Sequence, residues 1–303
     1  MTLPFFAPGR RSCRSPGFTL LELLVIVAVL SFAALCLTPA AARTRLNSQS
    51  FQCLNNHRQL ALAFQLYTAD NQEFLPPNPD DGNSMPGNNW CPGLAGVGEP
   101  QEFNPDVLKN PSLTLVARYL RGNTDVFRCP ADARLGRYTG NEPGKLGTNV
   151  RAARSVSLNH AVGTICASFD AGSGHSGAPK LATNGPWLDN AHSHRRDSPY
   201  RTFGKATSFT LVGHARIWLT MDEDAFSLND GNFVMGLNTA EWIDFPGTFH
   251  DMAASVSFHD GHVELHRWLD SRTRVVNGNV ARRTVPGSVD WQWLAERTSY
   301  RVP

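Results

Sequence analysis

The chain opens with an apolar run. Twenty residues, from Phe18 to Leu37, are apolar with three exceptions. The polar exceptions are Thr19, Glu22 and Ser31. As a helix rising about 1.5 Å per residue, a run of this length just spans a bilayer core. Three arginines precede it, and by the positive-inside rule they keep the N-terminus in the cytoplasm. We therefore expect a basic leader over 1–17 and a transmembrane helix over 18–38.

An amphipathic helical pattern follows the apolar run. Apolar residues recur at spacings of three and four between Leu46 and Tyr67. The prolines of "LPPNP" (75–79) forbid the helix from continuing, so it should end near Asp70. We expect this continuation, over 39–72, to pack its apolar face against a folded body over 73–303.

The rest of the chain mixes strand patterns with loops rich in glycine and proline. The clearest local signal is "AASVSFHDGHVELHRW" (253–268), where Asp260-Gly261 is a favoured two-residue type I′ turn. That turn pairs His259 with His262 and gives the hairpin one apolar and one polar face. The predicted fold class is therefore α+β, with a long N-terminal helix packed on an antiparallel sheet that carries long loops.

The distribution of charge argues against one class of function, nucleic-acid binding. The chain has 28 Lys and Arg against 26 Asp and Glu. Without the three arginines of the leader, 25 basic and 26 acidic residues remain. A nearly neutral body is not typical of proteins that bind nucleic acid, and we expect no nucleic-acid partner.

Glu22 does not fit an ordinary secretory signal peptide. A carboxylate in a transmembrane helix costs about 2.5–3.5 kcal/mol on insertion scales, and such residues are usually functional. With Gly17 before it, "FTLLELLVIVAVL" resembles the signal of type IV pilins and type II secretion pseudopilins. The resemblance implies that a prepilin peptidase cuts between Gly17 and Phe18 and methylates Phe18. It also identifies Glu22 as the glutamate of that family.

A second resemblance covers most of the chain. His250, nine intervening residues, and Asp260-Gly261 match the H-x9-D-G signature of a prepilin-like bacterial family. The segments "CLNNHRQLALAFQLYTADNQEFLP", "FRCPAD" and "MDEDAFSLNDGNF" also resemble that family, in the same order. This resemblance implies a pseudopilin-like fold, an exported body with the H-x9-D-G hairpin at 250–268, and no enzymatic activity.

Two metal hypotheses arise from the residues. Cross-strand His259 and His262 would lie close enough to share zinc, or they would simply stand on an exposed strand face. The stretch "DEDAFSLNDG" offers Asp222, Asp224 and Asp230, whose oxygens suit calcium. The alternative for these acids is a solvated turn between strands. The sequence indicates no required cofactor, and calcium is the one candidate.

Cysteines suggest disulfides. In the exported body there are four, Cys53, Cys91, Cys129 and Cys166, which allow up to two bridges and three connectivities. No pair has the CxxC spacing of a redox motif, and the spacings are poor for zinc. Because the segments that resemble the prepilin-like family carry Cys53 and Cys129, the resemblance implies a bridge between these two.

These observations favour a structural function. We expect an inner-membrane protein with a cytoplasmic N-terminus and an exported body. Its partners would be prepilin peptidase and other pilin or pseudopilin subunits, which it would contact through the N-terminal helix in a pilus or pseudopilus. The alternative is a membrane-anchored, exported protein that binds surface polysaccharide or another ligand. Seven tryptophans would supply stacking surfaces for a sugar, or would anchor the core.

Overall fold

A computed structural model describes residues 19–165 and 180–303, with the backbone alone for residues 33–48. The chain forms two compact units, residues 1–47 and 48–303. Helix α1 (Leu20–Asp70) contributes to both, and it ends at Asp70 as its pattern predicts. The other helices are α2 (Asp106–Lys109), α3 (Val289–Thr298), and the 3-10 turns η1 (Ala117–Leu120), η2 (Asp125–Phe127), η3 (Pro143–Lys145), η5 (Ala206–Phe209) and η6 (Ser271–Thr273).

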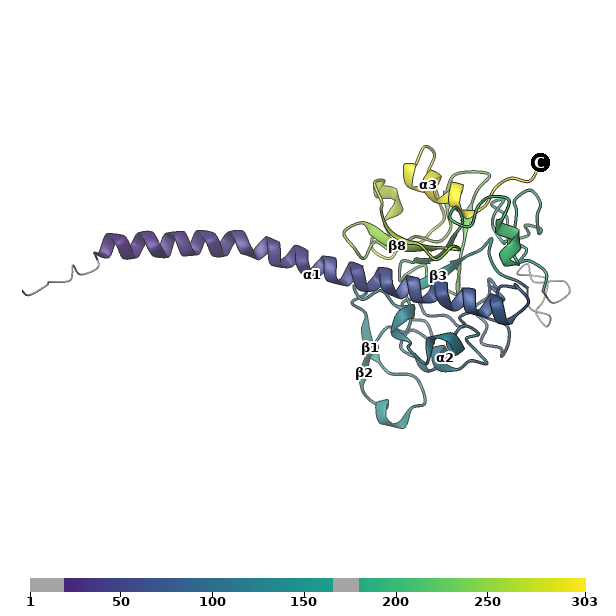
Figure 1. Ribbon diagram of the computed structural model, residues 1–303, viewed down its shortest axis with the longest axis horizontal. Coiled ribbons are helices and arrows are strands. Elements are labelled where there is room, and N and C mark those ends of the chain that lie inside the picture. The colour runs from purple at the N-terminus through teal and green to yellow at the C-terminus, as the bar shows by residue number, and fades with distance from the viewer. Residues whose placement is uncertain (1–18, 166–179) are drawn as a thin grey trace, which may run out of the picture. The chain divides into compact units, whose positions relative to one another are not determined.

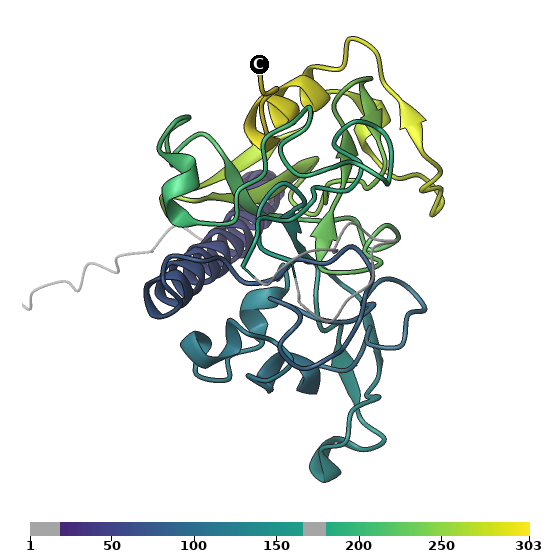
Figure 2. The same cartoon turned by 90° about the vertical axis from the view of Figure 1, so that its right-hand side faces the viewer.

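The described residues of the second unit form three sheets. A five-stranded sheet has the order β5-β3-β4-β8-β9, β10-β7-β6 form a second sheet, and β1-β2 form a ribbon. Their bounds are β1 (Leu135–Arg137), β2 (Asn149–Arg151), β3 (Val156–Asn159), β4 (Trp218–Asp222), β5 (Asn232–Phe233), β6 (Met235–Gly236), β7 (Glu241–Trp242), β8 (Ala253–Phe258), β9 (Val263–Arg267) and β10 (Arg283–Thr284). Within this unit, residues 48–70 of α1 lie between the five-stranded sheet and the segment that carries α2 (Figures 1 and 2).

Two apolar cores hold this unit together. In the first, Leu60 and Phe64 of α1 are buried with Leu108 of α2 and with Leu158 and Leu219 of the sheet. The second is formed by Trp218, Met221, Phe233, Trp242, Val256, Phe258, Trp268 and Leu294. Because both faces of the central strands are covered, β8 is buried along its whole length.

The hairpin between β8 and β9 differs from the prediction by one residue. Ser257 pairs with Val263, and the Phe258 N–H donates to the His262 carbonyl. The loop therefore has three residues, 259–261. Of these, Gly261 alone has a positive φ, +91°, whereas a type I′ turn needs positive φ at both central residues. The predicted pairing of His259 with His262 is wrong for this reason.

The predicted fold class needs correction, although helices and sheets are both present. Among the described residues, no helix is long and apolar enough to cross a membrane. The main sheet is not purely antiparallel either. Strand β5 follows β4 but lies on the far edge of β3, so it runs parallel to β3.

Candidate metal centre

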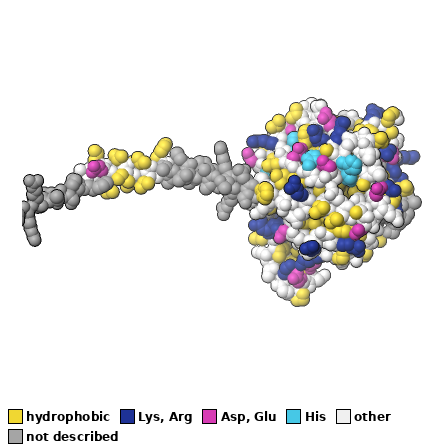
Figure 3. All heavy atoms as spheres, in the orientation of Figure 1, with side chains coloured by type: hydrophobic (Ala, Val, Ile, Leu, Met, Phe, Trp, Pro, Cys, Tyr) yellow, Lys and Arg dark blue, Asp and Glu magenta, His cyan; other side chains and the backbone are white. Residues whose placement is uncertain are grey.

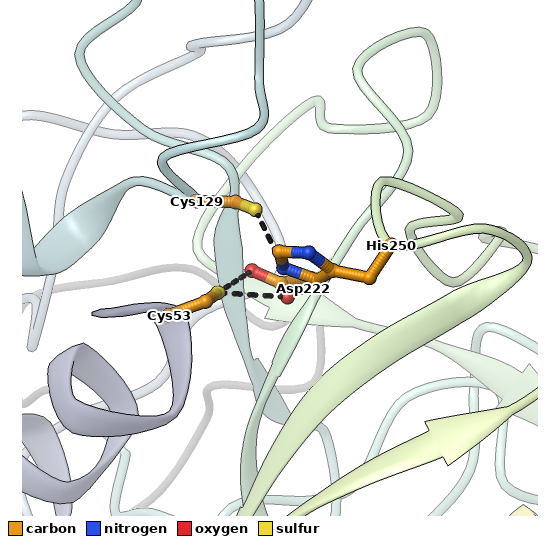
Figure 4. Close-up of side chains that lie close together, drawn as sticks. All are labelled: Cys53, Cys129, Asp222 and His250. Carbon is orange, nitrogen blue, oxygen red and sulfur yellow. Dashed lines mark hydrogen bonds between the residues drawn. The ribbon is translucent and has the colours of Figure 1, made fainter. Parts of the chain in front are cut away.

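Four side chains of the types that bind metal ions converge beside α1. They are Cys53, Cys129, Asp222 and His250, and their ligand atoms all lie within 4.8 Å of one another. Figure 4 shows the two sulfur atoms, the carboxylate and the imidazole pointing toward one point. Among the described residues this is the only group of three or more such side chains that could hold a metal ion.

Each member comes from a different segment. Cys53 lies on α1, Cys129 lies two residues after η2, and Asp222 ends β4. The register of β4 against β8 shifts between Trp218 and Met221, which is a β-bulge. Beyond this bulge, Asp222 makes contacts with α1, whereas Met221 belongs to the second core.

His250 stands in an unusual loop. The two residues that follow it, Asp251 and Met252, have φ values of +55° and +61°. Positive φ is uncommon outside glycine, and such strained backbone gathers at functional sites. The His250 N–H donates to the Ala253 carbonyl at 3.3 Å, which closes the loop onto the start of β8. The loop thus presents the imidazole to the other three side chains.

Direct contacts link the four side chains. The Cys53 thiol lies 3.2 Å from Asp222 Oδ2 and 3.5 Å from Oδ1. The Cys129 sulfur lies 3.1 Å from His250 Nε2. All four residues are buried, and His250, at 7%, is the most exposed of them.

A further layer of hydrogen bonds orients these groups. His250 Nδ1 lies 3.1 Å from the Ser50 hydroxyl, which leaves Nε2 directed at the cluster. The Asp222 carboxylate accepts from the Ser255 N–H at 2.9 Å, and it lies 3.3 Å from His57 Nε2. The other His57 nitrogen contacts the Thr220 hydroxyl at 2.8 Å.

The environment changes the protonation of the cluster. Burial raises the pKa of the Cys53 thiol well above its usual value, and the Cys129 and Asp222 charges act in the same direction. Burial also opposes ionisation of Cys129, but hydrogen bonds from Cys53 and His250 outweigh it and lower the pKa of that thiol. Burial likewise opposes charge on His250, yet the contact with Cys129 raises its pKa. The Cys129–His250 pair is therefore biased toward thiolate and imidazolium.

Asp222 is the acidic member of the cluster. Burial disfavours its charged form, but the His57 charge and hydrogen bond outweigh burial and lower the pKa of this carboxyl. The site thus holds one carboxylate and one thiol whose pKa is lowered, both fully buried. Buried anions of this kind are stable only when they are paired or bound to a metal.

The structure brings together the predicted cysteine pair without joining it. Cys53 and Cys129 both carry free thiols, so the predicted disulfide is absent from this structure. The physical reason lies in their surroundings, because the Cys53 thiol contacts Asp222 and the Cys129 sulfur contacts His250. Cys91 is also a free, buried thiol, and Cys166 lies outside the described residues.

The predicted calcium ligands do not form a site together. Asp222 belongs to the cysteine cluster, whereas Asp224 Oδ1 accepts from the Phe226 N–H and Asp230 Oδ1 accepts from the Asn232 N–H. Each of these two aspartates thus closes its own turn. Burial also raises the pKa of Asp230 well above its usual value, which favours the neutral acid over a calcium ligand.

The other predicted positions have separate environments. His259 stacks on Phe209, whereas His262 stacks on Phe258 and lies 2.6 Å from the Asp260 carboxylate, so the two histidines do not share a metal. Of the H-x9-D-G signature, Asp260 and Gly261 form the hairpin loop and His250 joins the cluster.

The processing site lies partly outside the described residues, which begin after Gly17 and Phe18. Glu22 is described. Its carboxylate accepts from the Thr19 N–H and hydroxyl, at 2.9 and 2.8 Å, at the start of α1.

Sequence patterns alone missed this cluster. No sequence pattern indicates His57, and the patterns place Cys53 and Cys129 in a disulfide, Asp222 in a calcium loop and His250 in the H-x9-D-G signature. The one signal that joins them is that each lies in a segment that resembles the prepilin-like family or belongs to its H-x9-D-G signature. No family model, curated protein or solved structure matches this chain.

Proposed function

We propose that this protein is a prepilin-like structural subunit that joins a pilus or pseudopilus through its N-terminal helix. In this proposal prepilin peptidase cuts after Gly17 at the inner membrane, and the body is exported. The peptidase and other pilin or pseudopilin subunits are its partners.

The observation that carries the proposal is the apolar surface of α1 in the first unit. Ten large apolar side chains between Leu20 and Phe32 are between 43% and 75% exposed. They are Leu20, Leu21, Leu23, Leu24, Val25, Ile26, Val27, Val29, Leu30 and Phe32. Figure 3 shows hydrophobic side chains along this part of the helix. An apolar patch this continuous marks a surface that another apolar partner covers, and the same helix from a neighbouring subunit is such a partner.

Glu22 has a local role besides any role in assembly. Thr19 and Glu22 form a capping box, because the Glu22 N–H donates to the Thr19 hydroxyl at 3.3 Å while the Glu22 carboxylate accepts from the Thr19 N–H. We propose that the carboxylate has a second role, pairing with the new amine of Phe18 on a neighbouring subunit. Two such charges attract strongly in a low dielectric, and an unpaired one is costly there.

The first experiment determines the mature N-terminus. Intact-mass and N-terminal peptide analysis of protein from its native host should find methylated Phe18 as the first residue. A first residue beyond the small residues of "TPAAA" (38–42) would instead indicate an ordinary signal peptidase and would overturn the proposal.

The second experiment separates the two roles of Glu22. Glu22→Gln keeps a side chain that can form the capping box but removes the charge, and Glu22→Ala removes both. If the charge docks the subunit, both variants are cleaved yet fail to enter filaments beside wild-type protein. If Glu22 only caps the helix, Glu22→Gln enters sheared filaments at wild-type efficiency, and the docking role is refuted.

One observation favours the alternative of an exported binding protein. A polar groove of about 360 Å³ lies between α1 and the segment that contains η2. It is lined by amides and charged groups, namely Gln49, Gln52, Asn55, Asn56, Asp125, Arg128 and Arg151. Such groups suit the hydroxyls of a polysaccharide. A glycan array probed with the full chain tests this function, and binding that survives Asn55→Ala with Arg128→Ala would place the ligand elsewhere.

A further inference from the structure

We propose that Cys53, Cys129, Asp222 and His250 bind one structural zinc ion, which fastens α1 to the body. This inference rests on residues 48–303 alone. It goes beyond the proposed function and does not depend on processing or assembly. If the experiments on the mature N-terminus or on filament entry contradict the proposed function, the metal site is still tested independently.

The spacing of the ligand atoms fits a tetrahedral ion. With metal–ligand bonds of about 2.0–2.3 Å, neighbouring ligands of a zinc tetrahedron lie roughly 3.3–3.8 Å apart. The Cys53–Asp222 and Cys129–His250 contacts are 3.2 and 3.1 Å, and every other pair lies within 4.8 Å. Small movements of the side chains would equalise these distances around one ion.

The chemistry of the ligands selects the metal. Two sulfurs, one imidazole and one carboxylate are the ligand types that zinc prefers, whereas calcium and magnesium take oxygen ligands. Zinc binds cysteine as the thiolate, so both coordinated sulfurs would be deprotonated in the metal-bound site.

The surrounding hydrogen bonds are those of an organised metal site. Histidine ligands usually fix their second nitrogen with a hydrogen bond, as His250 does with Ser50. The Asp222 carboxylate is held by the Ser255 N–H and lies against His57. These groups, which do not touch the ion, would hold its ligands in place.

The position of the site indicates a structural role. All four residues are buried, and together they supply four ligands, so no coordination position is left for a substrate. The ligands come from α1, the segment after η2, β4 and the loop before β8. One ion would therefore cross-link segments that are up to about 200 residues apart in sequence.

The test uses the full chain, purified with a reductant and stripped of metal by a chelator. Cobalt(II) is then added as a spectroscopic probe. We expect one equivalent to bind, with a thiolate-to-cobalt charge-transfer band, and zinc to displace it. Cys91→Ser is the matched control, because Cys91 is a buried thiol outside the cluster, and it should bind like the wild type.

Variants of the cluster separate ligands from positioning residues. Cys53→Ser and His250→Ala should abolish the charge-transfer band or weaken binding by more than about 100-fold. His57→Gln should weaken binding by about 10–100-fold, as is usual for partners of ligands. Since a variant that unfolds would also lose metal, Asp222→Cys provides a second measurement. It creates a site of three cysteines and one histidine that should keep the ion and strengthen the thiolate band.

Three results would overturn the inference. One is a reduced wild-type chain that binds neither cobalt nor zinc. Another is binding that persists unchanged in Cys53→Ser. The third is protein from the native host that carries a Cys53–Cys129 disulfide and no metal, since the thiols would then serve as a covalent bridge.

Discussion

Phe64 offers the sharpest test of how α1 joins the body. Its side chain is 1% exposed and lies in the first core, where its ring centroid is 5.4 Å from that of Trp90. Phe64→Ala removes this ring from the helix face that contacts the body. Leu62→Ala, two residues away on the same helix, is the control, because Leu62 is 53% exposed.

The expected loss follows from the burial. Replacing a buried phenylalanine with alanine costs about 3–5 kcal/mol, including the cavity that it leaves. The higher helix propensity of alanine recovers about 0.5 kcal/mol. The net loss should be about 3–4 kcal/mol, which is a large share of the roughly 5–15 kcal/mol typical of whole domains. The control should change the free energy of unfolding by less than about 0.5 kcal/mol.

Urea unfolding measures both variants. The full chain is unfolded in mild detergent and followed by tryptophan fluorescence, which reports on Trp90 beside the substituted ring. With a slope of about 3 kcal/mol per molar urea, Phe64→Ala should lower the midpoint by about 1 M. If its midpoint falls no further than that of Leu62→Ala, residues 48–70 do not pack on the body as described.

Two further predictions concern buried positions. Burial lowers the pKa of His160 to about 4, while its Nδ1 contacts the Pro186 carbonyl at 2.7 Å. An unfolded histidine titrates near 6.5. As the pH falls, the unfolded state therefore takes up this proton at a higher pH than the folded state does. The free energy of unfolding should therefore fall by about 3 kcal/mol between pH 6.5 and 4. His160→Asn, which keeps a donor for Pro186, should remove that part of the slope, and identical pH profiles of the two proteins would contradict it. Gly163 has a φ of +120°, and a Cβ there would lie 2.6 Å from Asn78 Cβ. Gly163→Ala should lower the melting temperature by several degrees, whereas Gly144→Ala, with open space around it, should not.

Local sequence determined the ends of α1. The helix ends at Asp70 in a local turn, where Gln72 and Glu73 have positive φ and the Glu73 N–H donates to the Thr68 carbonyl at 2.8 Å. The prolines of "LPPNP" then exclude any helix beyond this turn. The Thr19-x-x-Glu22 spacing likewise forms a capping box through contacts within one turn. The apolar spacing of 3.6 residues also marked the face that Leu60 and Phe64 bury.

Signals that depend on neighbouring strands were less reliable. The Asp260-Gly261 dipeptide favours a two-residue turn, yet β8 and β9 pair one residue out of that register. Strand β8 is central, so packing on both of its faces decides which residues point where. Val256 and Phe258 are buried in β8 whichever register β9 adopts, so the one-residue shift belongs to the three-residue loop 259–261, in which Gly261 alone has a positive φ.

Only the tertiary structure assembled the candidate metal centre. Cys53, Cys129, Asp222 and His250 have no short spacing that a sequence motif would reveal. The resemblance to the prepilin-like family predicted that Cys53 and Cys129 are partners, but it did not predict that a carboxylate and an imidazole join them. The convergence of these four side chains depends on a bulge in β4, a strained loop before β8 and the packing of residues 48–70 of α1 on the body. These are long-range contacts, and the sequence of each segment by itself carries no information about them.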